Sequence, residues 1–143
     1  MRIVLLLFAL PASQVVLASD WTPIPGATSQ GDEVLVDTAS ITDSVLGRKA
    51  WIKYRFAKPQ KIDAAIDKKA GGKEYRESIT LSRFDCDQRT MTPMQIDLRD
   101  ANGKVVSTGD YQALRVKVDV PPDTIAEAIL NFVCRLPAPE KRQ

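Results

Sequence analysis

The stretch ITLSRFDCDQR, residues 79–89, decides how this chain folds. It carries Cys86, the first of only two cysteines, at the end of a segment that reads as a β-strand. The second cysteine, Cys134, lies in the one segment with a convincing amphipathic helix pattern. A bond between these two residues would tie a sheet to a helix.

Residues 1–18 have the pattern of a secretory signal peptide. An unbroken apolar run, residues 3–10, is followed by Ala18, the small residue that a signal peptidase needs before the cleavage point. The run is too short to span a bilayer, and no later apolar stretch is long enough. Ser19 occupies the position where a lipoprotein would carry its lipidated cysteine. We therefore expect an exported domain, residues 19–143, in the periplasm or outside the cell, with no membrane span and no lipid anchor.

Export favours a disulfide between Cys86 and Cys134, because the compartments outside the cytoplasm are oxidising and a pair of cysteines there usually bonds. The two positions are 48 residues apart, so the bond would close a long loop. A free reactive thiol or a metal site is the alternative for these cysteines.

The chain contains no histidine. That excludes Ser-His-Asp and Cys-His catalysis in their usual forms, His-ligated zinc, and the commonest protein ligand of haem iron. Asp85 and Asp87 flank Cys86, and alternate side chains of a strand share a face, so the two carboxylates could converge. Their spacing matches no cation-binding loop. We expect no enzyme, no cofactor and no metal.

Alternation of apolar and polar residues predicts the strands. They lie at residues 33–37, 49–56, 75–86, 94–98 and 114–120, and Asn102-Gly103 predicts a hairpin after the fourth of them. Residues 21–27 contain two prolines, so if this run pairs, it does so at a sheet edge. Between these strands, residues 57–74 contain Pro59 and many lysines, which predicts a long, mobile connection.

Within residues 75–86 the apolar side chains change from odd to even positions. This change indicates either a bulge near Ser82 and Arg83, or a strand that is covered on both faces.

The helix pattern begins at Thr124, a good N-cap, with Glu127 three residues later as in a capping box. An apolar stripe at helical spacing follows, and we expect it to pack on the sheet: Ile125, Ile129, Phe132, Val133 and Leu136. The predicted fold is α+β, a single antiparallel β-sheet of about six strands packed against a C-terminal α-helix, with one sheet-to-helix disulfide.

The order of these features resembles the surface-adhesin protein E family of Gram-negative bacteria. The resemblance implies the same sheet and helix, with the two cysteines bonded, and it implies binding to host extracellular-matrix or plasma proteins. The matching pieces are Trp21, Val36-Asp37, Ser40-Ile41, Trp51, Phe84-Asp85-Cys86, residues 102–106, Pro122, residues 124–131 and Phe132-Val133-Cys134.

Charge is unevenly distributed along the exported domain. Residues 19–47 contain five acids and no bases, whereas residues 48–83 contain eleven bases and four acids. Five lysines of the predicted connection are candidate binding residues: Lys58, Lys61, Lys68, Lys69 and Lys73. They would suit a polyanionic glycan or an acidic protein surface, and export disfavours nucleic acid.

Two alternatives accompany this hypothesis. The lysines could serve only to keep the connection solvated and to pair with the acidic first segment. The whole domain could be a periplasmic accessory or structural domain that packs on a partner protein.

Overall fold

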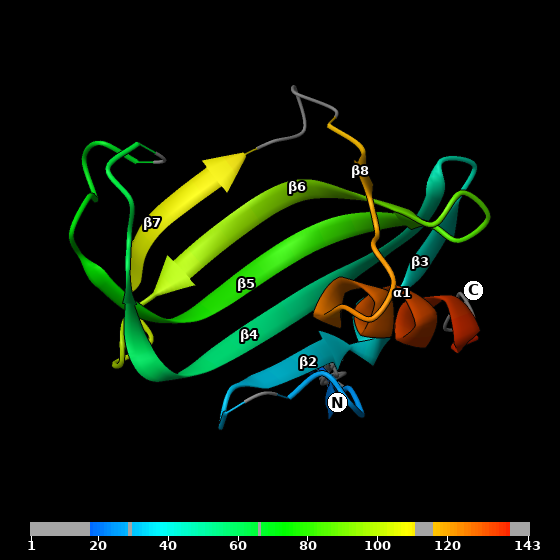
Figure 1. Ribbon diagram of the computed structural model, residues 1–143, viewed down its shortest axis with the longest axis horizontal. Coiled ribbons are helices and arrows are strands. Elements are labelled where there is room, and N and C mark those ends of the chain that lie inside the picture. Colours follow the sequence, from blue (N-terminus) through cyan, green and yellow to red (C-terminus); the bar gives the residue numbers. More distant parts are fainter. Residues whose placement is uncertain (1–17, 29, 66, 111–115, 138–143) are drawn as a thin grey trace, which may run out of the picture.

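The computed structural model describes residues 18–28, 30–65, 67–110 and 116–137, so the predicted signal segment lies outside it except for its last position. The described residues form one sheet and one α-helix, α1 (Ile125–Arg135) (Figure 1). The strands are β1 (Trp21–Pro23), β2 (Glu33–Asp37), β3 (Thr42–Ser44), β4 (Gly47–Lys61), β5 (Glu74–Asp85), β6 (Thr90–Arg99), β7 (Val105–Asp110) and β8 (Val118–Asp119), and η1 (Thr38–Ser40) is a short 3-10 helix.

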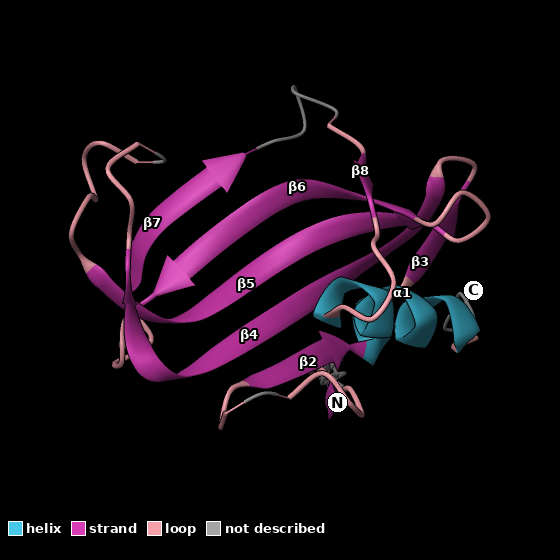
Figure 2. Cartoon of the chain, in the orientation of Figure 1, coloured by secondary structure: helices cyan, strands magenta, loops and turns pink. Residues whose placement is uncertain are grey.

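All strand pairings in the described residues are antiparallel, in the order β1-β2-β4-β5-β6-β7 (Figure 2). In addition, β3 pairs with β4 and β8 pairs with β6. The single antiparallel sheet is therefore confirmed, but it has eight strands and the predicted number of about six was wrong. Thr42–Ser44 has no apolar residue to alternate, so the sequence carries no strand signal there.

Glycine allows the turn that brings β3 against β4. Gly47 has φ +112°, and a β-carbon there would lie 2.4 Å from the backbone oxygen of Phe84. The chain therefore reverses within two residues, Val45 and Leu46, and Ser44 pairs with Gly47.

The predicted strand at residues 114–120 is mostly absent. Residues 114 and 115 lie outside the described part of the chain, and β8 covers only Val118–Asp119. Val116 and Val118 are 54% and 46% exposed, and Val120 is the one buried residue of this segment in the described part. β8 pairs with β6 at two positions only, so little ladder is formed there.

The two faces of β5 are distinct along its whole length. Ser78, Ser82 and Phe84 are buried on the face that α1 packs against, and Ile79 is buried on the other face. The second alternative for this strand is therefore the right one: both faces are covered. The bulge lies opposite, in β6, where the register with β5 shifts between Leu81 and Ser82.

The β4–β5 connection is shorter than predicted. β4 runs on through Pro59, with a register irregularity between Arg55 and Gln60, and ends at Lys61. Two residues of the remaining loop are buried, Ile62 and Ala70. The expectation of a long, mobile connection was wrong in its extent, because backbone pairing and these two anchors order much of it.

The helix begins where the sequence predicts it. The Thr124 hydroxyl accepts a hydrogen bond from the Glu127 N–H at 3.2 Å, while the Glu127 carboxylate accepts from the Asp123 N–H at 2.8 Å. That second bond lies one residue earlier than in a standard capping box. Leu130 is buried although the predicted stripe omits it, and Ile125, which the stripe includes, is 40% exposed.

The predicted disulfide is confirmed. Cys86 follows β5 directly and is bonded to Cys134 in the last turn of α1, with an S–S distance of 2.05 Å. Arg48 of β4 adds a second tie, because its guanidinium donates to the carbonyls of Val133 and Leu136. The sheet and the C-terminal end of the helix are therefore joined twice.

Candidate functional site

The helix covers only part of its face of the sheet, and the rest forms a cleft of about 1230 Å³. α1 packs over β4 and β5, and the curved sheet continues past it to β6 and β7 (Figure 1). The floor comes from β4, β5 and β6, α1 forms one side, and β7 with residues 67–69 closes the far end. This cleft is the candidate functional site, because ligands bind in concave, largely apolar hollows.

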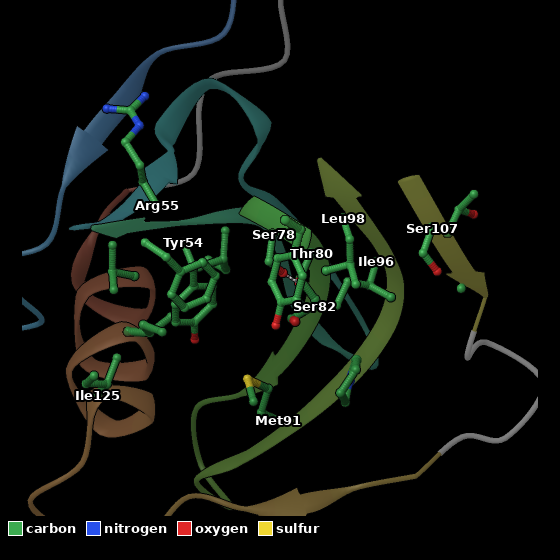
Figure 3. Close-up of a pocket in the computed structure, with 18 of the residues that line it drawn as sticks. Tyr54, Arg55, Ser78, Thr80, Ser82, Met91, Ile96, Leu98, Ser107 and Ile125 are labelled. Carbon is green, nitrogen blue, oxygen red and sulfur yellow. Dashed lines mark hydrogen bonds between the residues drawn. The ribbon is translucent and has the colours of Figure 1, made fainter. Parts of the chain in front are cut away.

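Apolar side chains dominate the lining. Ile96 and Leu98 of β6 face Ile125 of α1 across the cleft, with Tyr54 between them (Figure 3). Burial raises the pKa of the Tyr54 phenol, so the phenol stays neutral at neutral pH. The exposed Ile125 thus gains a role, since it contributes to the wall of the cleft instead of the core.

An aromatic group from β4 and β5 also lines the cleft. The rings of Tyr54 and Phe56 are stacked with centroids 6.4 Å apart, and Phe56 meets Tyr75 edge-on at 5.6 Å. Tyr54 and Phe56 alternate on β4, and Tyr75 pairs with Gln60 across the irregularity in that strand. Such aromatic contacts rigidify a binding surface at little cost in side-chain entropy.

A row of hydroxyl groups runs through the apolar floor. Ser78, Thr80 and Ser82 occupy alternate positions of β5, and Ser78 and Ser82 are buried. The hydroxyls of Ser78 and Thr80 bond each other at 3.4 Å, and Figure 3 shows all three side chains on the cleft face. The floor is therefore apolar with one narrow polar line.

Asp67 ties the β4–β5 loop to the far end of the cleft. Its carboxylate accepts hydrogen bonds from the Ser107 hydroxyl at 2.5 Å and from the N–H groups of Lys69 and Ala70 at 2.9 and 3.1 Å. The bond from Ser107 is the main reason that the pKa of Asp67 is lowered. The loop is thus fastened to β7 by a carboxylate that stays ionised.

This contact predicts a local response to acid. Because the pKa of Asp67 in the folded protein lies below its ordinary value of 3.8, the contact is at full strength above pH 3.8 and is lost as pH falls through the lower value. The amide resonances of Lys69 and Ala70 should shift over that lower range in an NMR titration, and the Asp67→Asn variant should show no such shift. A midpoint at or above 3.8 would contradict the contact.

The structure places three of the five predicted lysines on the β4–β5 loop and two on β4 itself. Lys58 and Lys61 lie on the last part of β4, and Lys68, Lys69 and Lys73 lie on the loop. Lys68 and Lys69 also line the cleft. None of the five ammonium groups forms an ion pair within the described part of the chain.

The acidic first segment is engaged elsewhere. Asp43 pairs with Arg48 at 2.7 Å and Glu33 pairs with Arg55 at 2.9 Å. The other three acids of that segment accept hydrogen bonds: Asp20 from Thr38, Asp32 from the Ala57 N–H and Asp37 from the Asp20 N–H. The alternative in which these acids neutralise the five lysines therefore finds no support in the contacts.

Asp85 and Asp87 both line a second hollow, of about 660 Å³, beside the Cys86–Cys134 disulfide. The Asp85 carboxylate accepts a hydrogen bond from the Gln88 N–H at 3.0 Å and lies 3.7 Å from the Lys117 ammonium. In the part of the chain that the structure describes, no three His, Cys, Asp or Glu side chains gather as metal ligands would.

Sequence reasoning missed the cleft, although one signal could have revealed it. α1 has 11 residues, which makes it about 16 Å long. The predicted strand at residues 75–86 has 12 residues, which extend about 40 Å. A helix of that length cannot cover the face of so large a sheet, so part of that face had to remain open.

Residues 21–135 match the family described as surface-adhesin protein E. No curated protein matches the chain. No helix among the described residues is long and apolar enough to cross a membrane. The matched region contains all eight strands and α1, which includes the cleft and the disulfide. The chain therefore belongs to the surface-adhesin protein E family.

Proposed function

We propose that this protein is an exported, non-enzymatic binding module that attaches to acidic partners through five lysines, Lys58 and Lys61 at the end of β4 and Lys68, Lys69 and Lys73 on the β4–β5 loop. The partner is a polyanionic glycan, or an acidic surface on a host extracellular-matrix or plasma protein. Membership of an adhesin family supports a role in attachment. The observation that carries the proposal is that these five cations have no ion-pair partner among the described residues.

Unpaired surface lysines favour association for a physical reason. An acidic partner can approach them without first breaking an internal ion pair, and a cluster of like charges steers such a partner from a distance. Each contact is solvent-exposed, so its contribution is small and screened by salt. Binding should therefore depend on several lysines together and weaken as salt is added.

Replacing Lys68, Lys69 and Lys73 by glutamine should weaken binding to immobilised heparin and to matrix proteins by about tenfold or more. The reason is the loss of three charges that have no internal partner. Elution position along a salt gradient is the measurement, and the variant should elute at lower salt than the native protein.

A matched control removes three charges at the opposite end of the sheet. Lys49, Lys117 and Arg135 replaced by glutamine give the same net charge as the first variant, so simple charge reduction predicts equal effects. The proposal predicts a much smaller effect for this control. If the two variants elute together, or if native binding does not change with salt, the five lysines are not the site.

The alternative, an accessory domain that packs on a partner protein, is favoured by one surface feature. Val45 and Leu46 at the β3–β4 turn are 102% and 64% exposed. Two exposed apolar side chains on a hairpin tip are suited to a protein pocket. This tip lies at the other end of β4 from the lysines, so Val45→Ser with Leu46→Ser should leave heparin retention unchanged and would abolish only a contact made by the tip.

A further inference from the structure

The cleft beside α1 is too large to be a packing defect. The cleft is open to solvent, and soluble proteins seldom leave a large contiguous apolar surface exposed unless it contacts a ligand or a partner. At about 1230 Å³ the cleft is larger than the typical pocket that holds a small ligand, about 300–1,000 Å³. A hollow of this size requires an explanation in terms of what it binds.

The floor of the cleft suits a chain with no hydrogen-bonding groups. β4, β5 and β6 each pair with a strand on both sides, so their backbone donors and acceptors are largely used within the sheet. The hydroxyls of Ser78 and Thr80 share one hydrogen bond, and the Ser82 hydroxyl and the Tyr54 phenol are the other polar side-chain groups from β4 and β5 that this part of the floor offers. A peptide lying here would bury backbone groups that the floor could not satisfy, whereas an acyl chain has no such groups.

The far end of the cleft, formed by β7 and residues 67–69, contains two lysines. Lys68 and Lys69 line it, and neither ammonium has an ion pair in the described residues. The acids nearby are already engaged: Glu33 by Arg55, Asp32 by the Ala57 N–H, Asp67 by Ser107 and two backbone N–H groups, and Asp110 is not free. These carboxylates keep their negative charge, so the lining as a whole is not cationic. Lys68 and Lys69 are nevertheless the lining cations without an ion pair among the described residues, and they can pair with the carboxylate of a ligand.

We propose that the cleft binds a long-chain fatty acid. The acyl chain lies along the floor against Ile96 and Leu98 of β6 and Ile125 of α1, and the carboxylate meets Lys68 and Lys69. This activity goes beyond attachment to acidic partners, because it uses the interior of the cleft and only two of the five lysines.

Binding is measured with dansyl-undecanoic acid, a fatty acid whose fluorescence rises in an apolar site, and with unlabelled fatty acids as competitors. Each added methylene should tighten the competitor by about fourfold until the chain outgrows the cleft. The methyl ester of the same chain lacks the charge and should compete more weakly. The proposal would be overturned if the affinity of the competitors did not depend on chain length, or if the methyl ester competed as strongly as the acid.

Two variants fill the cleft. Thr80→Trp places a large ring on the floor from β5, and Leu98→Trp does so from β6, which keeps the test sound if one of them fails to fold. Circular dichroism identifies the folded variants. A folded variant should bind the probe at least tenfold more weakly, and unchanged binding would place the probe elsewhere on the protein.

A charge variant and its matched control complete the test. Lys68→Gln with Lys69→Gln should weaken probe binding by about threefold to tenfold. Lys58→Gln with Lys61→Gln removes the same charge from the end of β4, outside the cleft lining, and should leave probe binding unchanged.

The same variants separate this proposal from the proposed attachment function. Lys58→Gln with Lys61→Gln should lower heparin retention, and a folded Thr80→Trp should leave it unchanged. If the native protein does not bind heparin, only the attachment proposal is refuted, and the fatty-acid proposal is unaffected. If the probe does not bind and an extended peptide does, the cleft is a peptide site at the edge of β7, and the fatty-acid proposal is wrong.

Discussion

Replacing Cys86 and Cys134 by alanine is expected to lower the melting temperature by about 10 °C or more. The bond joins residues 48 apart, and loop closure of that length restricts the unfolded chain by about 4 kcal/mol. In a domain of this size, each kcal/mol of lost unfolding free energy lowers the melting temperature by about 3–4 °C. Thermal unfolding followed by circular dichroism measures the difference.

The hydrogen bonds from Arg48 to the carbonyls of Val133 and Leu136 remain in the cysteine variant, so α1 should still dock on the sheet. A native-like spectrum at low temperature with a lower melting temperature is thus the expected combination. Thiol titration of the unfolded, unreduced native protein should find no free thiol. Two free thiols would refute the disulfide.

Phe84→Ala should destabilise the protein by about 3–5 kcal/mol, a large share of the 5–15 kcal/mol typical of whole domains. Phe84 is 0% exposed and belongs to the same core cluster as Ile129 and Val133 of α1. Its removal leaves a cavity at the contact between sheet and helix, which the surrounding strands cannot close. Urea unfolding monitored by tryptophan fluorescence gives the free energy of unfolding.

Leu81→Ala on the same strand is the matched control. Leu81 lies on the opposite face of β5, is only half-buried, and is no member of the core cluster around α1. We expect its replacement to cost clearly less than that of Phe84. Equal losses would mean that the two faces of β5 are assigned wrongly.

Much of the architecture could be predicted from local sequence patterns. The alternating residues of β2, β4 and β5 and the cap at Thr124 each depend on neighbours within a few positions, so the amino-acid order carries them directly. β3 has no apolar pattern and was missed, whereas the alternation in residues 114–120 predicted a strand of which the described residues form only Val118–Asp119. The pairing of β3 depends on the turn at Gly47, and that of β8 on two positions of β6, which are contacts that a local pattern does not show.

The basic surface was likewise visible in part from the sequence and in part only from the folded structure. The accumulation of the five lysines in one segment is visible in the order of residues, and it suggested a basic surface. Whether they were neutralised depended on contacts between segments far apart in the chain. The pairings of Asp43 with Arg48 and of Glu33 with Arg55, which leave the lysines without those acids, exist only in the folded protein.

The sequence by itself determined an antiparallel sheet, a capped C-terminal helix, and a disulfide between Cys86 and Cys134, since alternation, capping residues and a single cysteine pair are properties of the chain. Only the tertiary structure decided that an open cleft lies beside the helix, with Lys68 and Lys69 in its lining. The reason is geometric: a helix of 11 residues meets a sheet whose longest strand has 15, and how much of the face it leaves open depends on where it docks.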